Sequence, residues 1–258
     1  MSADGKAERQ IAGFQIQVDP EPAKRNVPPA CRARILDARG KAHFTANEHG
    51  MNILDVSGKN ISGGDTPDVV FEGYSGGAHC CWTYWIVSLS QPPKLLRKLG
   101  NSRGFGFEDL NNDGKIELVA EDGAFENFDG LPRYASPAPQ AILRLNGTKL
   151  ERVDSEFWPL YEKKIADATR LLTPECAGLF RKLDLRVNKE CDSINTRLQI
   201  LTIVLNNLYG GREKEAWEEL AKYWPEKDLQ RERALILSTA GSSFLADPSN
   251  PNYGAAKE

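Results

Sequence analysis

The sequence predicts an α+β protein in which an N-terminal antiparallel β domain is followed by a C-terminal helical domain. Residues 1–150 hold 17 of the 22 Gly and 10 of the 15 Pro. Gly and Pro punctuate short strands and turns, so their loss after residue 150 marks a change to helices. Apolar residues alternate with polar ones in the first part and recur every three or four residues in the second. We therefore expect a β domain over residues 1–153, a helical domain over 154–245 and a flexible tail over 246–258.

The β domain contains short strands separated by turns. Strict alternation predicts one strand over residues 11–18. The clearest strands are 67–72 and 81–89, because they are rich in β-branched and aromatic residues. Asn146-Gly147 is a typical hairpin turn. Further strands are expected at 31–37, 41–46, 117–121, 140–145 and 149–153.

The strand at 81–89 carries aromatic residues on both faces, since Trp82 and Tyr84 alternate with Trp85. We expect both faces to be covered. The alternative is an exposed aromatic face that recognises a ligand.

The second part predicts amphipathic helices. Asp154 or Ser155 caps a helix that reaches residue 172, and Thr173-Pro174 starts the next one. A long helix shows one apolar stripe and ends at Gly210-Gly211. Its stripe consists of Ile194, Leu198, Leu201, Leu205 and Leu208. Two more helices, at 213–223 and 227–239, carry or flank Trp217 and Trp224, which we interpret as packing anchors rather than as part of a helical interaction module.

Composition excludes two classes of protein. The chain has 258 residues and a net charge of −3, so it lacks the basic field of a nucleic-acid binder. No segment approaches the roughly 20 apolar residues of a transmembrane helix. The first ten residues are polar and show no targeting signal.

An acidic loop is the strongest motif. Side-chain oxygens fall at loop positions 1, 3, 5 and 9, with Gly114 at position 6. Such a loop suits Ca²⁺, which takes six to eight oxygen ligands at about 2.3–2.6 Å. The predicted ligands are the side chains of Asp109, Asn111, Asp113 and Glu117, together with the backbone carbonyl of Lys115. An EF-hand is excluded because position 12 is Ala120, inside an expected strand.

With Gly104-Phe-Gly-Phe107 before it and Leu118-Val119 after it, this loop resembles the FG-GAP and VCBS-type repeats of integrin-like β-propellers. The resemblance covers about residues 50–125. It implies a loop that binds Ca²⁺ and fastens the turn between blade strands.

A second, degraded copy of the loop lies 49 residues earlier, from Asn60 to Asp68. We expect it to be a structural turn with weak or absent metal binding. Because two repeats cannot close a propeller, we expect an incomplete or divergent propeller-like β domain.

The segment from Gly73 to Gly77 matches the G-x-S-x-G pattern of a hydrolase nucleophile, Ser75. A strand is expected after it instead of a helix, and no His lies beyond His79. We therefore interpret the segment as a hairpin connection.

The cysteines leave several pairings open. The sequence His79-Cys80-Cys81 suits either a soft-metal site or disulfide chemistry, and we favour the latter. Cys176 and Cys191 are expected to cross-link a helix pair. Cys31 either pairs with one of Cys80 and Cys81 or stays free beside a vicinal disulfide.

The favoured function is an exported, non-enzymatic, calcium-stabilised binding or scaffold protein, periplasmic or secreted, with a protein or glycan as its ligand. Millimolar external Ca²⁺ and paired cysteines both suit an exported chain. The alternative is a metal-dependent hydrolase with an acidic site at one end of the β domain. Its candidate residues are His79, Asp109, Asp113, Glu121 and Asp122. The loop Glu126–Gly130 could contribute to such a site or be a plain turn.

Overall fold

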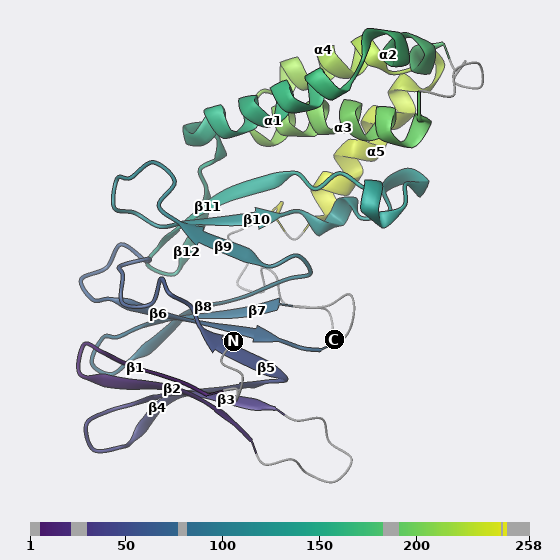
Figure 1. Ribbon diagram of the computed structural model, residues 1–258. Helices are drawn as coiled ribbons and strands as arrows, with labels where there is room; N and C mark the ends of the chain where they lie inside the picture. Colours follow the sequence, from purple (N-terminus) through teal and green to yellow (C-terminus); the bar gives the residue numbers. More distant parts are fainter. Residues whose placement is uncertain (1–5, 22–29, 77–81, 183–190, 244, 247–258) are drawn as a thin grey trace. The chain divides into compact units, whose positions relative to one another are not determined.

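The computed structural model describes residues 6–21, 30–76, 82–182, 191–243 and 245–246. Within them, twelve strands form three antiparallel sheets, and five α-helices lie in the C-terminal half (Figure 1). The predicted α+β class is therefore confirmed. None of the three described sheets closes into a barrel.

Each sheet is a meander of four consecutive strands. The first sheet contains β1 (Ala7–Ile11), β2 (Phe14–Pro20), β3 (Cys31–Leu36) and β4 (Ala42–Glu48). The second contains β5 (Gly50–Ile53), β6 (Asp68–Tyr74), β7 (Trp82–Ser88) and β8 (Lys94–Asn101). The third contains β9 (Phe105–Glu108), β10 (Glu117–Glu121), β11 (Gln140–Asn146) and β12 (Lys149–Arg152).

A hydrophobic core joins the first two sheets, which lie face to face (Figure 1). In β2 the buried residues are Phe14, Ile16 and Val18, every second position, as the alternation requires. From the second sheet, Phe71 of β6 and Trp85 of β7 enter the same core.

The other face of β7 is also covered. Tyr84 is 2% exposed, and its ring lies 5.5 Å from that of Phe105 and 5.6 Å from that of Phe107. Trp85 is 6% exposed on the opposite face. The expectation that both faces are covered is confirmed, and the alternative of an exposed recognition face is wrong for Tyr84 and Trp85.

The predicted strand at 11–18 is wrong in its extent, because the alternating pattern runs across a hairpin. Ala12 and Gly13 both have positive φ, 50° and 83°, and turn the chain between β1 and β2. The strands β5, β8 and β9 and, apart from Ile11, β1 were not predicted. The strand β8 contains three basic residues, and its burial shows no alternation, since its last three residues are all buried.

The helices are α1 (Trp158–Leu171), α2 (Pro174–Arg181), α3 (Ser193–Tyr209), α4 (Glu213–Tyr223) and α5 (Leu229–Ser242). The predicted start of α2 at Thr173-Pro174 and the predicted end of α3 at Gly210-Gly211 are confirmed. The long helix α3 is buried almost all round and contacts α1, α2 and α4. Trp224 is buried and its ring lies 5.1 Å from that of Phe180, as a packing anchor should.

The predicted cap of α1 is wrong. Asp154 and Ser155 lie in a short 3₁₀ helix, Asp154–Phe157, that precedes α1. Asp154 is buried and accepts a hydrogen bond from the backbone N–H of Ile142 at 2.7 Å, so its carboxylate is bound elsewhere.

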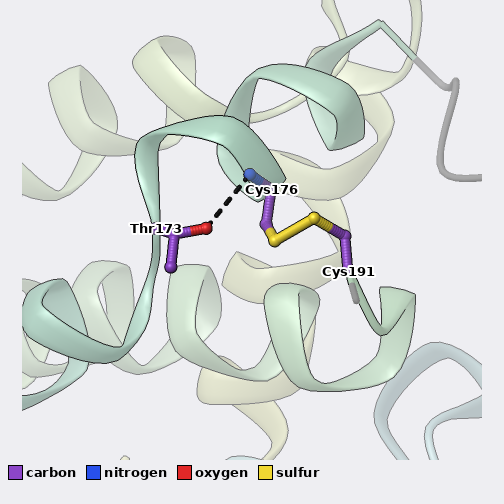
Figure 2. Close-up of a disulfide and its surroundings, with 3 residues drawn as sticks. All are labelled: Thr173, Cys176 and Cys191. Atoms are coloured by element: carbon purple, nitrogen blue, oxygen red, sulfur yellow. Dashed lines mark hydrogen bonds between the residues drawn. A yellow bond between two sulfur atoms is a disulfide. The ribbon is translucent and has the colours of Figure 1, made fainter. Parts of the chain in front are cut away.

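The Cys176–Cys191 disulfide forms as predicted (Figure 2). The Cα atoms are 5.1 Å apart, within the usual range for a disulfide. Thr173 caps α2 by accepting from the backbone N–H of Cys176 at 3.2 Å (Figure 2). The disulfide thus ties the first turn of a capped helix, α2, to Cys191, which directly precedes the N-cap of α3.

The chain forms two compact units. The first contains the described residues up to 120 together with residues 143–151, and the second contains 121–142 together with the described part of 152–246. None of the helices in the described ranges has the length and apolar content needed to cross a membrane.

Candidate functional site: two loops of the β unit

The loop from Asp109 to Lys115 connects β9 to β10 and folds around its own side-chain oxygens. The two carboxylate oxygens of Asp109 accept from the N–H groups of Asp113, at 3.0 Å, and of Gly114, at 2.9 Å. Asn111 Oδ1 also accepts from Asp113 N–H at 3.1 Å, and Asp113 Oδ1 accepts from Lys115 N–H at 2.9 Å. These four bonds explain why the sequence needs Asp or Asn at alternate positions here.

Backbone geometry supports the same tight turn. Asn112 and Gly114 have φ of 59° and 85°, in the left-handed region that Asn tolerates and Gly favours. Asp113 is exposed, and the hydrogen bond from Lys115 N–H lowers the pKa of its carboxyl. The carboxylate of Asp113 therefore stays ionised in mildly acidic solution.

Glu117, the fifth predicted ligand, has hydrogen-bond partners of its own. Its side chain is fully buried. Its Oε1 accepts from Arg144 Nε at 3.1 Å and Nη2 at 2.8 Å, while Oε2 accepts from Leu110 N–H at 3.2 Å. Both oxygens are therefore occupied by protein donors.

These contacts decide how the loop fits a cation. The side chains of Asp109, Asn111 and Asp113 converge on one turn, and their oxygens are of the kind that Ca²⁺ prefers. Among the described residues, however, no group of three or more His, Cys, Asp or Glu side chains lies close enough together to hold a metal ion. The loop thus offers two carboxylates, one amide oxygen and backbone carbonyls, while Glu117 is held by Arg144.

The earlier loop has an equivalent anchor. Asp68, the first residue of β6, is fully buried, and its Oδ2 accepts from the N–H groups of Ile61 and Ser62, both at 2.8 Å. The spacing of 49 residues relates Asp68 to Glu117 and Ile61 to Leu110. In both loops, the second loop residue therefore donates its N–H to the carboxylate that begins the following strand.

The two anchors differ in how their charge is treated. Asp68 Oδ1 has no hydrogen-bond partner in the described part of the chain, and burial raises the pKa of its carboxyl. Glu117 instead forms a two-nitrogen ion pair with Arg144. The predicted degradation of the earlier loop thus extends to its buried carboxylate, which has no cationic partner among the residues that the structure describes.

A cavity of about 410 Å³ lies between the two loops. Asn60, Ile61 and Gly63 line it from the earlier loop, and Gly114 and Lys115 line it from the later one. The remaining lining comes from β11 and β12: Arg144, Leu145, Asn146 and Glu151. The two related loops therefore share one depression, whose charged lining residues are Lys115, Arg144 and Glu151.

The hairpin interpretation of the Gly73–Gly77 segment is confirmed. Strand β6 pairs antiparallel with β7, with Tyr74 opposite Trp82, so the next described element after the Gly-rich pattern is a strand. A Cβ on Gly73 would lie 2.7 Å from the Trp85 ring, which explains a glycine there. His79, Cys80 and Cys81 lie outside the described residues, and Cys31 forms no disulfide with any residue inside them.

In the helical unit, the buried carboxylate of Asp122 accepts hydrogen bonds on both of its oxygens. Its Oδ1 accepts from Ala124 N–H at 2.9 Å and its Oδ2 accepts from the hydroxyl of Tyr209. Nearby, Asp154 accepts from the Tyr161 hydroxyl and from Arg152 Nε, both at 2.7 Å. Burial raises the pKa of both tyrosines. The hydrogen-bond donors around Asp122 thus hold its carboxylate in place inside the helical unit.

The loop Glu126–Gly130 is also held by helices. Arg197 donates to the carbonyl of Asp129 at 2.9 Å and to its carboxylate, which also accepts from Arg231. Beside them lies Glu232, which is fully buried and 3.6 Å from each of these arginines. Burial raises the pKa of Glu232 to about 7. Sequence periodicity missed this cluster because its members come from three separate segments.

Comparison with known proteins gives partial similarities. No family model matches the chain, and no solved structure matches it. A probable thylakoid lumen protein of Synechocystis is 30% identical over 167 residues, which cover 61% of this chain and 44% of that protein. An uncharacterized protein of Sinorhizobium fredii is 30% identical over 112 residues, which cover 38% of this chain and 16% of that protein. The chain thus spans less than half the length of each of these curated relatives.

Proposed function

We propose that this chain is an exported, non-enzymatic binding or scaffold protein whose β unit is stabilised by Ca²⁺ at the loop Asp109–Glu117. Its partner is a protein or a glycan. We also propose kinship with FG-GAP and VCBS-type repeat proteins over about residues 50–125. The equivalent carboxylate anchors at Asp68 and Glu117 support that kinship.

The observation that carries the calcium proposal is the convergence of Asp109, Asn111 and Asp113 on one tight turn. These side chains, with the carbonyl of Lys115, would hold the ion. Bound Ca²⁺ neutralises clustered carboxylates, and the ordering it gives the loop contributes to folding free energy. Glu117 acts as the fixed end of the loop through its ion pair with Arg144.

Two observations support export. The Cys176–Cys191 disulfide is of a kind that persists in oxidising compartments and is rare in the cytosol. One partial relative is a probable thylakoid lumen protein.

Engaged side chains favour binding over catalysis. Asp122, a candidate of the hydrolase alternative, is buried and accepts from Tyr209 and from Ala124 N–H. Asp109 is bound to two backbone amides of its own loop. A binding or scaffold role needs a rigid β unit, and the two loops of this unit share a cavity of about 410 Å³.

Thermal unfolding in EGTA and in millimolar CaCl₂ tests the calcium proposal. At a free concentration of about 100 times its Kd, Ca²⁺ should add about 2.7 kcal/mol to the free energy of unfolding. Asp113→Ala should abolish that increase, because it removes an exposed carboxylate from the turn. A direct calorimetric titration with Ca²⁺ should show one site in the natural protein.

Asp65→Ala is the matched control. Asp65 is also an exposed acidic residue, but it lies in the earlier loop, where we expect weak or absent binding. The proposal fails if Ca²⁺ does not stabilise the natural protein, or if Asp113→Ala responds to Ca²⁺ as Asp65→Ala does.

A further inference from the structure

The helical unit contains a cavity of about 550 Å³ that belongs to none of the sites described above. It lies among α1, α2 and α4. Leu172 and Ala177, each 7% exposed, contribute apolar lining, and the ring of Tyr223 lies beside them. A volume of this size falls within the range of about 300–1,000 Å³ that is typical of small-molecule pockets.

The charged lining of this cavity is entirely basic. Arg170, Arg181 and Lys222 each lie in the last turn of their helix, and no Asp or Glu is among the described residues that line it. A cation at a helix C-terminus complements the helix dipole, which accounts for each residue separately. The dipole does not account for the convergence of three such residues on one apolar cavity.

The three basic side chains differ in their ion-pair and hydrogen-bond partners. Arg170 binds Asp167 at 2.9 Å, and Lys222 Nζ binds Glu219 at 3.2 Å, in both cases within their own helix. Arg181 reaches from α2 to α4, where its Nη1 donates to the carbonyl of Lys222 at 2.9 Å. This hydrogen bond uses one N–H donor of the guanidinium and holds the Arg181 side chain beside Lys222. Its acceptor is a backbone carbonyl and not an acidic side chain. A guanidinium has five N–H donors, and this is the one hydrogen bond that Arg181 makes within the described residues, so it has further donors of the kind that bind a carboxylate in pairs.

We propose that this cavity binds a small amphiphilic carboxylate, with its apolar part on Leu172 and Ala177 and its carboxylate paired with Arg181 and Lys222. Charge complementarity selects an anion, and the apolar lining selects a molecule with a short hydrocarbon chain or a ring. The inference rests on the proposed function only in that both are binding roles. It does not depend on the calcium-type loop, because the cavity lies in the second compact unit and the loop in the first.

Calorimetric titration with octanoate tests this proposal on the full chain. The titration is done in EGTA, so that its outcome is independent of the calcium proposal. We expect saturable binding at one site, no binding of the uncharged analogue 1-octanol at the same concentrations, and affinity that falls as salt rises.

Arg181→Gln should weaken octanoate binding about tenfold, which corresponds to about 1.4 kcal/mol. Lys214→Gln is the matched control, because Lys214 is an exposed cation on α4 that does not line the cavity. Both positions are on the surface, and unchanged thermal unfolding of each variant establishes that it is folded. Absence of saturable binding overturns the proposal. So does equal binding of 1-octanol, or equal octanoate affinity in Arg181→Gln and Lys214→Gln.

Discussion

Asp68 and Glu117 occupy equivalent places at the starts of β6 and β10, and both are fully buried. Each accepts a hydrogen bond from the second residue of the loop before it. Glu117 also has Arg144, whereas one oxygen of Asp68 has no partner in the described ranges. The repeat thus keeps the backbone hydrogen bond to its carboxylate, but the two copies differ in what compensates the burial of that carboxylate. An arginine neutralises one carboxylate, and burial favours protonation of the other.

The largest expected effect comes from removing the arginine of the paired copy. Arg144→Ala leaves Glu117 as a buried carboxylate without its cation, and breaking such a pair costs about 3–5 kcal/mol. Urea unfolding at pH 7 measures the loss. Adding Glu117→Gln to Arg144→Ala should recover part of it, because the uncompensated charge is gone. A loss below about 1 kcal/mol in Arg144→Ala would show that the pair does not govern stability.

An intermediate effect is expected at Glu232, a third buried carboxylate that resembles Asp68. Neither of its oxygens has a hydrogen-bond partner in the described part of the chain. Burial raises its pKa from 4.5 to about 7, so the folded protein holds a proton that the unfolded chain releases. The stability that this proton provides is fully present below pH 4.5 and is lost as the pH rises through about 7.

Glu232→Gln should therefore be more stable than the natural protein at pH 8, by at most about 3 kcal/mol, and similar to it at pH 4.5. Chemical denaturation at several pH values gives the free energy of unfolding for both. Parallel pH profiles for the variant and the natural protein would contradict the assignment to Glu232.

The smallest effect is expected at Asp68 itself. Asp68→Asn keeps an oxygen that can accept from Ile61 and Ser62, and it removes a charge that burial already disfavours. We expect a change within about 1 kcal/mol, measured by the same urea unfolding as Arg144→Ala. If Asp68→Asn costs as much as Arg144→Ala, the two copies handle their charge in the same way and the comparison fails.

Sequence reasoning predicted the elements that local chemistry determines. The cap at Thr173, the end of α3 at Gly210 and the hairpin between β11 and β12, which turns at Gly147 directly after Asn146, each depend on a few neighbouring residues. The turn at Ala12-Gly13 was missed because Ala rarely adopts positive φ, so the alternation looked continuous. The strand β8 was missed because it has no period of two: basic residues interrupt its apolar ones, and its pairing with β7 shifts register between Ile86 and Val87.

The partners of the candidate residues could not be predicted, because they are distant in sequence. Glu117 is bound by Arg144, 27 residues later. Asp122 is bound by Tyr209, 87 residues later. A spacing rule identifies side chains that suit a metal, but tertiary packing decides whether another group occupies them first. The acidic loop was therefore predicted from sequence, while the commitment of its last carboxylate was visible only in three dimensions.

The backbone of the described chain passes from one compact unit to the other after residues 120, 142 and 151. A single protease cut after residue 151 would therefore leave residues 121–142 on the N-terminal fragment, while Tyr209 and Arg197, which bind Asp122 and Asp129, stay on the C-terminal one. The two fragments would remain associated until denatured. Nicked molecules would thus elute as one species on gel filtration and separate only under denaturing electrophoresis.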